Sequence, residues 1–154
     1  MPATDLHHLA IKCVDVNATV QFYNDVIGSH SVKRPNFDFP GAWLQFGTTM
    51  IHLYGGDAAK NSKGGHDSGS AAIDHIALTA YGFDEMQQTL ERKKLVWRQF
   101  DIPSFNLWQL FVFDPNGVLV ELNFNSAKEP TDSKGPGDFL RYEPGKFTFN
   151  SIVN

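Results

Sequence analysis

Four side chains that can bind a metal ion stand at matching places in an internal repeat. A histidine opens the alternating segment Leu6–Cys13, and another opens Ile73–Ala80, which reads as a second copy of the first. Later in each copy, Met50–Tyr54 matches Leu119–Asn123, so that a histidine and a glutamate occupy equivalent positions. The four candidate ligands are His8, His52, His75 and Glu121.

Imidazole nitrogens and a carboxylate oxygen are ligands that Zn, Ni, Co, Mn and Fe(II) accept. A metal ion held in this way with one or two open positions acts as a Lewis acid. A single histidine on a strand is more often a structural residue. Burying three imidazoles and a carboxylate together without an ion would be costly, however. We therefore predict that the set binds a divalent metal ion.

Each copy is predicted to contain a strand, a helix and three further strands. In the first copy the strand covers residues 6–14 and the helix about 16–27, with Gly28 as its stop, followed by strands at 30–34, 42–46 and 49–54. In the second copy the strand covers residues 74–79 and the helix about 83–94, followed by strands at 96–101, 107–113 and 118–124.

Side-chain alternation along these strands separates polar from aliphatic residues. On the last strand, Glu121 and Asn123 oppose Val120 and Leu122, and His52 likewise opposes aliphatic neighbours. This pattern predicts a polar pocket on one side of a sheet whose other side is covered by helices. The expected fold is α+β, with two tandem βαβββ modules that form a curved mixed eight-stranded sheet with the helices on its convex side.

The chain divides by composition into four parts. A stretch with five glycines and no apolar period separates the two copies, and a polar tail rich in proline and glycine follows the second copy. The tail is expected to be a wrapping arm or partly disordered. The boundaries are residues 5–54 for the first module, 55–71 for the linker, 72–125 for the second module and 126–154 for the C-terminal arm.

Composition excludes several classes of partner. The 154 residues carry a formal charge of −4, without the basic stripe that nucleic-acid binding requires. No apolar run approaches the roughly 20 residues that span a bilayer, and no signal peptide is recognisable. Cys13 is the single cysteine and fits a reducing compartment. We expect a cytoplasmic protein that binds a small molecule or a second copy of itself.

Four segments resemble the vicinal oxygen chelate superfamily, which includes glyoxalase I, methylmalonyl-CoA epimerase, extradiol dioxygenases and fosfomycin-resistance thiol transferases. The resemblance covers about residues 5–125. In that superfamily the metal ligands come from the first and last strands of each module, which implies the four candidate ligands named above. The segments are His8-Leu-Ala-Ile11, Ile51-His-Leu53, Asp74-His-Ile-Ala-Leu78 and Phe113-Asp-Pro-Asn-Gly-Val-Leu-Val-Glu-Leu122.

The resemblance implies a metal-dependent lyase or isomerase of glyoxalase I type, with Zn, Ni or Co favoured and Fe(II) or Mn as alternatives. Glu121 would then be both a ligand and the group that moves a proton between adjacent carbons. Lys12 and Gly56 replace the arginine and asparagine that hold glutathione in such enzymes, so the thiol stays open. Residues considered for substrate binding are Lys12, Arg34, Trp43, Arg98 and Trp108.

Two other functions stay open. An Fe(II) ring-cleaving dioxygenase could use His8, His75 and Glu121, although its further catalytic histidine and tyrosine are missing at Thr48-Thr49 and in Leu110–Phe113. A binding protein without turnover, as in bleomycin-resistance relatives, is the third possibility. Relatives in this superfamily are often homodimers, and we expect a homodimer here.

Overall fold

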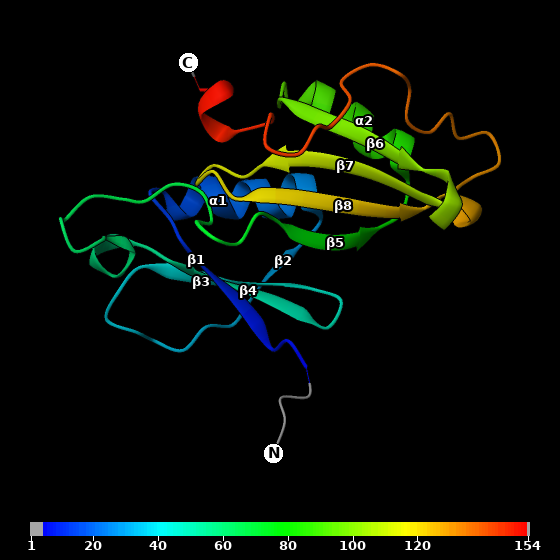
Figure 1. Cartoon of the computed structure of the whole chain (residues 1–154). Coiled ribbons are helices and arrows are strands. Elements are labelled where there is room, and N and C mark those ends of the chain that lie inside the picture. The colour runs from blue at the N-terminus through cyan, green and yellow to red at the C-terminus, as the bar shows by residue number, and fades with distance from the viewer. Residues whose placement is uncertain (1–4, 154) are drawn as a thin grey trace. The chain divides into compact units, whose positions relative to one another are not determined.

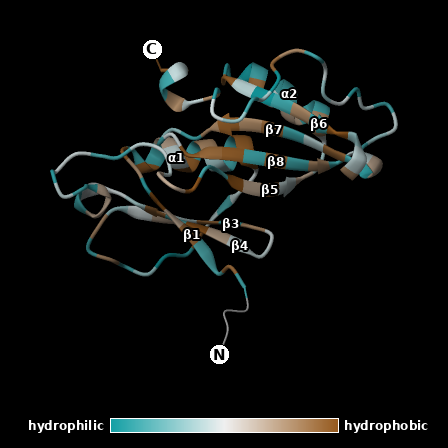
Figure 2. Cartoon of the chain, viewed as in Figure 1, coloured by the Kyte–Doolittle hydropathy of each residue, from teal (hydrophilic) through white to brown (hydrophobic). Residues whose placement is uncertain are grey.

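The computed structural model describes residues 5–153, and the chain forms two compact units, residues 1–68 and 69–154. Figure 1 shows the elements of both units in chain order. In Figure 2 the strands carry many of the hydrophobic residues and the long loops are mostly hydrophilic. None of the helices within residues 5–153 has the length and apolar character that a bilayer crossing demands.

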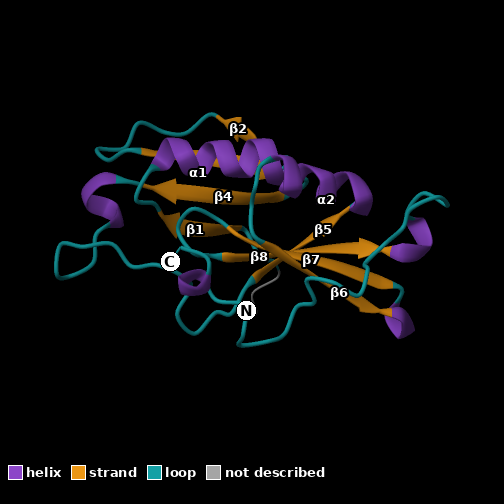
Figure 3. Ribbon diagram, turned by 90° about the horizontal axis from the view of Figure 1, so that it is seen from above, coloured by secondary structure: helices purple, strands orange, loops and turns teal. Residues whose placement is uncertain are grey.

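The first unit is one four-stranded sheet with a helix (Figure 3). The sheet has the order β1-β4-β3-β2, in which β1 and β4 are parallel and the other pairs antiparallel. Its elements are β1 (His8–Lys12), α1 (Val16–Phe22), a π-helical turn (Tyr23–Ile27), β2 (His30–Val32), β3 (Gly41–Phe46) and β4 (Thr49–Tyr54).

Local signals account for the helix of the first unit. The Asp15 carboxylate accepts a hydrogen bond from the backbone N–H of Ala18 at 3.0 Å, which caps α1 at its start. Gly28 ends the helical segment in the left-handed conformation, with φ of 88°. The predicted helix is therefore present, but its second half is a π-helical turn.

The second unit repeats the same order of elements. Its sheet has the order β5-β8-β7-β6, again with the first and last strands parallel. Phe83 packs edge-on against the rings of Trp108 and Phe124, which fixes the helix on one face of this sheet. The elements are β5 (Ile76–Ala80), α2 (Phe83–Arg92), β6 (Trp97–Ile102), β7 (Leu107–Phe113) and β8 (Leu119–Asn125).

The α+β class and the strand-helix-three-strand order of both modules are confirmed. The eight strands are hydrogen-bonded as two separate four-stranded sheets. Cys13 is fully buried, as expected of a small hydrophobic residue next to β1.

The first part of the C-terminal arm is hydrogen-bonded to the N-terminus of α2. The buried Glu129 carboxylate accepts hydrogen bonds from the N–H groups of Gly82 at 3.1 Å and Phe83 at 2.8 Å. In return, Asp84 of α2 accepts hydrogen bonds from Ser133, Lys134 and Gly135 of the arm. Burial opposes ionisation of Asp84, but these hydrogen bonds outweigh it and lower the pKa of the carboxyl.

Replacing Glu129 with alanine should destabilise the protein. The change leaves two helix N–H groups without their charged acceptor in a buried place, so we expect a loss of about 2 kcal/mol in the free energy of unfolding, measured by urea titration. Glu91→Ala, on the exposed side of α2, should stay within about 0.5 kcal/mol of the wild type. Equal stability of the two variants would contradict the capping role.

Candidate functional site

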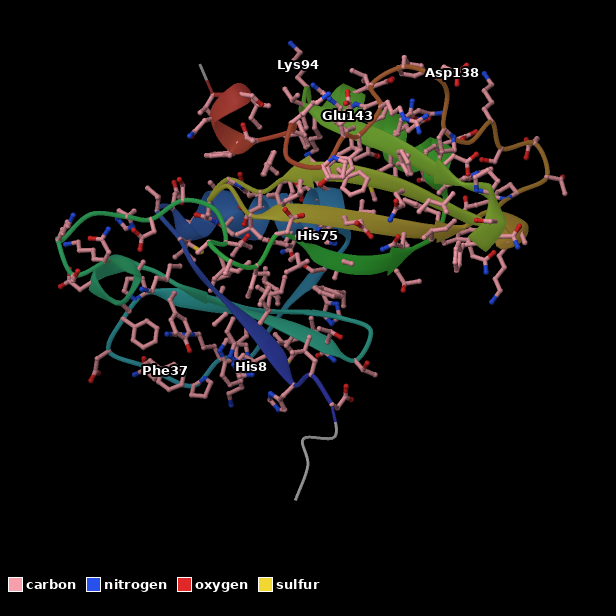
Figure 4. All side chains as sticks on the ribbon, viewed as in Figure 1. His8, Phe37, His75, Lys94, Asp138 and Glu143 are labelled. Atoms are coloured by element: carbon pink, nitrogen blue, oxygen red, sulfur yellow. The ribbon has the colours of Figure 1, made fainter. Side chains whose placement is uncertain are left out.

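In the first unit, two of the predicted ligands are stacked on each other. Ala10 pairs with His52 in the parallel ladder between β1 and β4, so His8, two residues from Ala10, shares a face with His52. The His8 and His52 ring centroids lie 3.9 Å apart with 17° between the planes. Trp43 stacks on His52 with 4.2 Å between centroids and 5° between planes. His52 is thus held between two rings, and His8 projects from β1 in Figure 4.

The His52 ring has an unused nitrogen. Its Nε2 atom is buried and has no hydrogen-bond partner among the residues that the structure describes. Burial lowers the pKa of His52, and the neighbouring His8 and His7 lower it further. The ring is therefore kept in its neutral form, which is the form that can bind a metal ion.

His7 provides a partner for the other histidine. The Nδ1 atoms of His7 and His8 lie 2.9 Å apart, and the two rings meet edge to face. With Nδ1 engaged in this way, Nε2 is the nitrogen that His8 can offer to a ligand. The first unit therefore brings two imidazoles together, and the Trp43 ring stacks on one of them, His52.

In the second unit, the other two predicted ligands face each other. His75 lies directly before β5, and Glu121 pairs with Ala77 in the parallel ladder between β5 and β8. The distance from His75 Nε2 to Glu121 Oε2 is 3.2 Å. Glu121 is buried, with 8% of its surface exposed.

Neighbouring side chains orient both members of this pair. Asp74 Oδ2 lies 2.8 Å from His75 Nδ1, and because a carboxylate only accepts, Nδ1 must donate, which leaves Nε2 to face Glu121. On the far side, Glu121 Oε1 accepts hydrogen bonds from Gln109 at 2.8 Å and Asn123 at 2.7 Å. Gln109 also donates to Asn123, at 3.0 Å. The Oε2 atom of Glu121 is thereby directed to His75.

The spacing within each unit is compatible with metal binding. Two ligand atoms that each lie about 2.0–2.2 Å from one ion stand roughly 3 Å apart, and the His75–Glu121 separation of 3.2 Å matches this. The orphaned Nε2 of His52 is a further indication that a partner is missing. Each unit supplies two of the four candidates, and among residues 5–153 no three or more histidine, cysteine, aspartate or glutamate side chains are grouped so that they could hold a metal ion.

Sequence reasoning missed three residues of the second pair's surroundings. Asp74, Gln109 and Tyr142 have no predicted role in the sequence analysis. Burial raises the pKa of Tyr142, and the charges of Asp74 and Glu121 raise it further. The position of Asp74 next to His75 was a usable signal. Gln109 and Tyr142 depend on strand register and tail packing, which no local pattern shows.

The substrate-binding candidates of the first unit lie on or beside the sheet. Trp43 contacts His52 directly, whereas Lys12 is exposed at the end of β1. Arg34 lies over the rings of Phe37 and Phe39, at 4.7 and 4.8 Å from their centroids. It also donates to the carbonyl of Phe39 at 3.0 Å, so part of its hydrogen-bonding capacity is used in its own loop.

The candidates of the second unit lie on opposite faces. Arg98 pairs with Phe111, which in turn pairs with Glu121, so Arg98 shares the Glu121 face and lies over the ring of Phe147. Trp108 is on the other face, packed on Phe83. The sequence-based placement of Trp108 near the substrate is corrected accordingly. It is a packing residue between the sheet and α2.

The shifted pKa of His52 predicts a pH-dependent stability of the metal-free protein. The unfolded chain takes up a proton at His52 near pH 6.5, before the folded protein does, so stability should fall as the pH is lowered through that value. Urea midpoints at pH values from about 7.5 to 5.5 would measure the fall. His52→Asn should flatten the profile, whereas His66→Asn, in an exposed loop, should keep the wild-type slope.

Comparison with known proteins agrees with this geometry. The family model described as Glyoxalase/Bleomycin resistance protein/Dioxygenase superfamily matches residues 5–122. Glyoxylase I 4 of Arabidopsis thaliana is 29% identical over 131 residues, which cover 77% of this chain and 70% of that protein.

Solved structures share the fold at low sequence identity. A glyoxylase/bleomycin resistance protein/dioxygenase domain from Frankia sp. EAN1pec has a TM-score of 0.65 at 16% identity, covering 80% of this chain and 98% of that one. Lactoylglutathione lyase from Agrobacterium tumefaciens has a TM-score of 0.62 at 18% identity, covering 83% and 98%. With two βαβββ modules and a family match over most of its length, the chain belongs to the Glyoxalase/Bleomycin resistance protein/Dioxygenase superfamily.

Proposed function

We propose that the protein is a metal-dependent lyase or isomerase of glyoxalase I type, which moves a proton between the two carbons next to a chelated carbonyl. The observation that carries the proposal is the oriented pair of His75 and Glu121, whose facing atoms lie 3.2 Å apart. The superfamily match and the similarity to Glyoxylase I 4 support the same class of reaction.

The proposed metal ligands are His8, His52, His75 and Glu121. A bound divalent ion would act as a Lewis acid that stabilises negative charge on the substrate oxygens. The neighbouring side chains of the protein orient the ligand atoms. Burial lowers the pKa of His52, whose ring lies between Trp43 and His8, and Asp74 orients the ring of His75 by accepting from its Nδ1 atom.

Glu121 is proposed to transfer the proton. For a hemithioacetal of a 2-oxoaldehyde, its Oε2 atom would take the proton from the carbon that carries sulfur and return it to the neighbouring carbon. The electron pair of the broken C–H bond first becomes the C=C bond of an enediol and then the new C–H bond at the neighbouring carbon. The hydroxyl proton moves to the former ketone oxygen, and the electron pair left on the hydroxyl oxygen completes the thioester carbonyl, so atoms and electrons balance without a further reactant. Gln109 and Asn123 donate to Oε1 throughout, which leaves Oε2 as the reacting atom.

The thiol and the organic group of the substrate are open in this proposal. Lys12 and Gly56 stand where glutathione-binding residues are expected, which favours testing several thiols. Trp43 stacks on the proposed ligand His52 and offers an apolar surface beside it. The expected homodimer and cytoplasmic location also remain predictions.

Metal analysis of protein purified without a histidine tag tests the proposal. We expect near-stoichiometric Zn, Ni or Co, with strongly reduced metal content in His52→Ala and in His75→Ala, and unchanged content in His66→Ala. Oxygen-sensitive Fe(II) would favour the dioxygenase, which retains His8, His75 and Glu121. Protein that takes up no metal under any loading condition would contradict both reactions and leave a binding protein.

Glu121→Gln should abolish turnover of the hemithioacetals formed from methylglyoxal or phenylglyoxal with a panel of thiols. Loss of a general base costs about 10²- to 10⁴-fold in rate. The amide can still accept the hydrogen bonds of Gln109 and Asn123, so the thermal midpoint should change little. Glu91→Gln serves as the matched surface control. A wild-type rate in Glu121→Gln at equal metal content would exclude Glu121 as the base.

A further inference from the structure

The C-terminal arm lies on the same face of the second sheet as Glu121. Phe111 pairs with Glu121 across β7 and β8, and residues paired in this way point to one side. Tyr142 of the arm stacks on Phe111, with 3.7 Å between the ring centroids and 7° between the planes. Phe147 packs on Phe113, the next residue of the same face along β7, with 4.8 Å between centroids. A tail segment therefore covers the sheet beside the candidate site.

The place of Tyr142 is fixed by backbone hydrogen bonds. Gln99 of β6 donates to the carbonyl of Leu140 at 2.9 Å, and Tyr142 donates to the carbonyl of Gln99 at 2.8 Å. The Gln99 side chain is fully buried and donates to Phe139 at 2.7 Å. Gln99 of β6 and Arg141 of the arm thus form an isolated parallel β-bridge, which holds Tyr142 next to the edge of the sheet.

The hydroxyl of Tyr142 can donate a hydrogen bond. Tyr142 is 9% exposed, and its ring stacks on Phe111, the residue that pairs with Glu121. A phenol carries its proton at neutral pH. It can therefore donate a hydrogen bond to an acceptor oxygen placed beside it.

We propose that Tyr142 is a substrate-binding residue of the Glu121 site, whose hydroxyl donates a hydrogen bond to a substrate oxygen beside the carbon that Glu121 deprotonates. The stacked rings of Tyr142 and Phe111 form the apolar wall on this side of the site. The inference rests on the proposed function, since it assigns the donor for the oxygen on which that reaction develops negative charge. A preoriented donor at such an oxygen stabilises the transition state more than the ground state.

The test compares the metal-loaded wild type with Tyr142→Phe and with the matched control Tyr81→Phe. Tyr142→Phe keeps the ring stack and removes only the hydroxyl, whereas Tyr81 is 68% exposed in the same unit. Benzohydroxamate, a planar anion with two adjacent oxygens, is the binding probe, and its affinity is measured by calorimetry. Metal content and thermal midpoint are measured on the same samples.

For Tyr142→Phe we expect a loss of about tenfold or more in benzohydroxamate affinity, because the hydrogen bond is made to a charged acceptor. Turnover of the hemithioacetal substrates should fall by a similar factor, in kcat more than in KM. Metal content and the thermal midpoint should stay at the wild-type values, and Tyr81→Phe should match the wild type throughout.

The outcomes that would contradict the role of Tyr142 can be told apart from those that would contradict the proposed function. If the wild type binds and turns over, and Tyr142→Phe equals it, the assignment of Tyr142 is overturned while the proposed function stands. If Tyr142→Phe loses affinity only because it loses metal or unfolds, Tyr142 is a structural residue and the assignment is again overturned. If the loaded wild type neither binds benzohydroxamate nor turns over any hemithioacetal, the proposed function falls, and the role of Tyr142 falls with it.

Discussion

The alternation of side chains along a β-strand is the constraint on which the site in each unit depends. In both units the first and last strands are parallel neighbours, so residues in register point to the same side. One side of each sheet holds aliphatic residues under a helix, and the other is left for polar groups. This is why His8 meets His52, and why His75 meets Glu121, although about forty residues separate the members of each pair along the chain.

The two units use this shared plan for different chemistry. In the first, stacked rings surround a neutral imidazole, and no carboxylate takes part. In the second, a carboxylate is fixed by two amide groups and an imidazole by another carboxylate. Among the four proposed ligands, Glu121 is thus the one with a carboxylate.

Much of this arrangement could be predicted from the sequence, because a repeat and a two-residue period are visible without long-range information. The four candidate ligands and the order of elements in each module came from these two signals. Other features depend on register between strands, which the sequence does not show. Gln109 lies beside Glu121 and Trp108 lies on the opposite face, and only the pairing of β7 with β8 decides between them. The π-helical turn at Tyr23–Ile27 likewise has no local signature that separates it from an α-helix.

The covering of β7 by the arm has a consequence for protein synthesis. Phe111 and Phe113 leave the ribosome well before Tyr142 and Phe147, which cover them. Phe111 and Phe113 of the second sheet therefore stay exposed until Tyr142 and Phe147 have been synthesised. Nascent chains with exposed apolar surface associate readily. Termination of translation shortly before Tyr142 would make that state permanent. The segment with Tyr142 and Phe147 is thus needed to cover Phe111 and Phe113 of the second sheet.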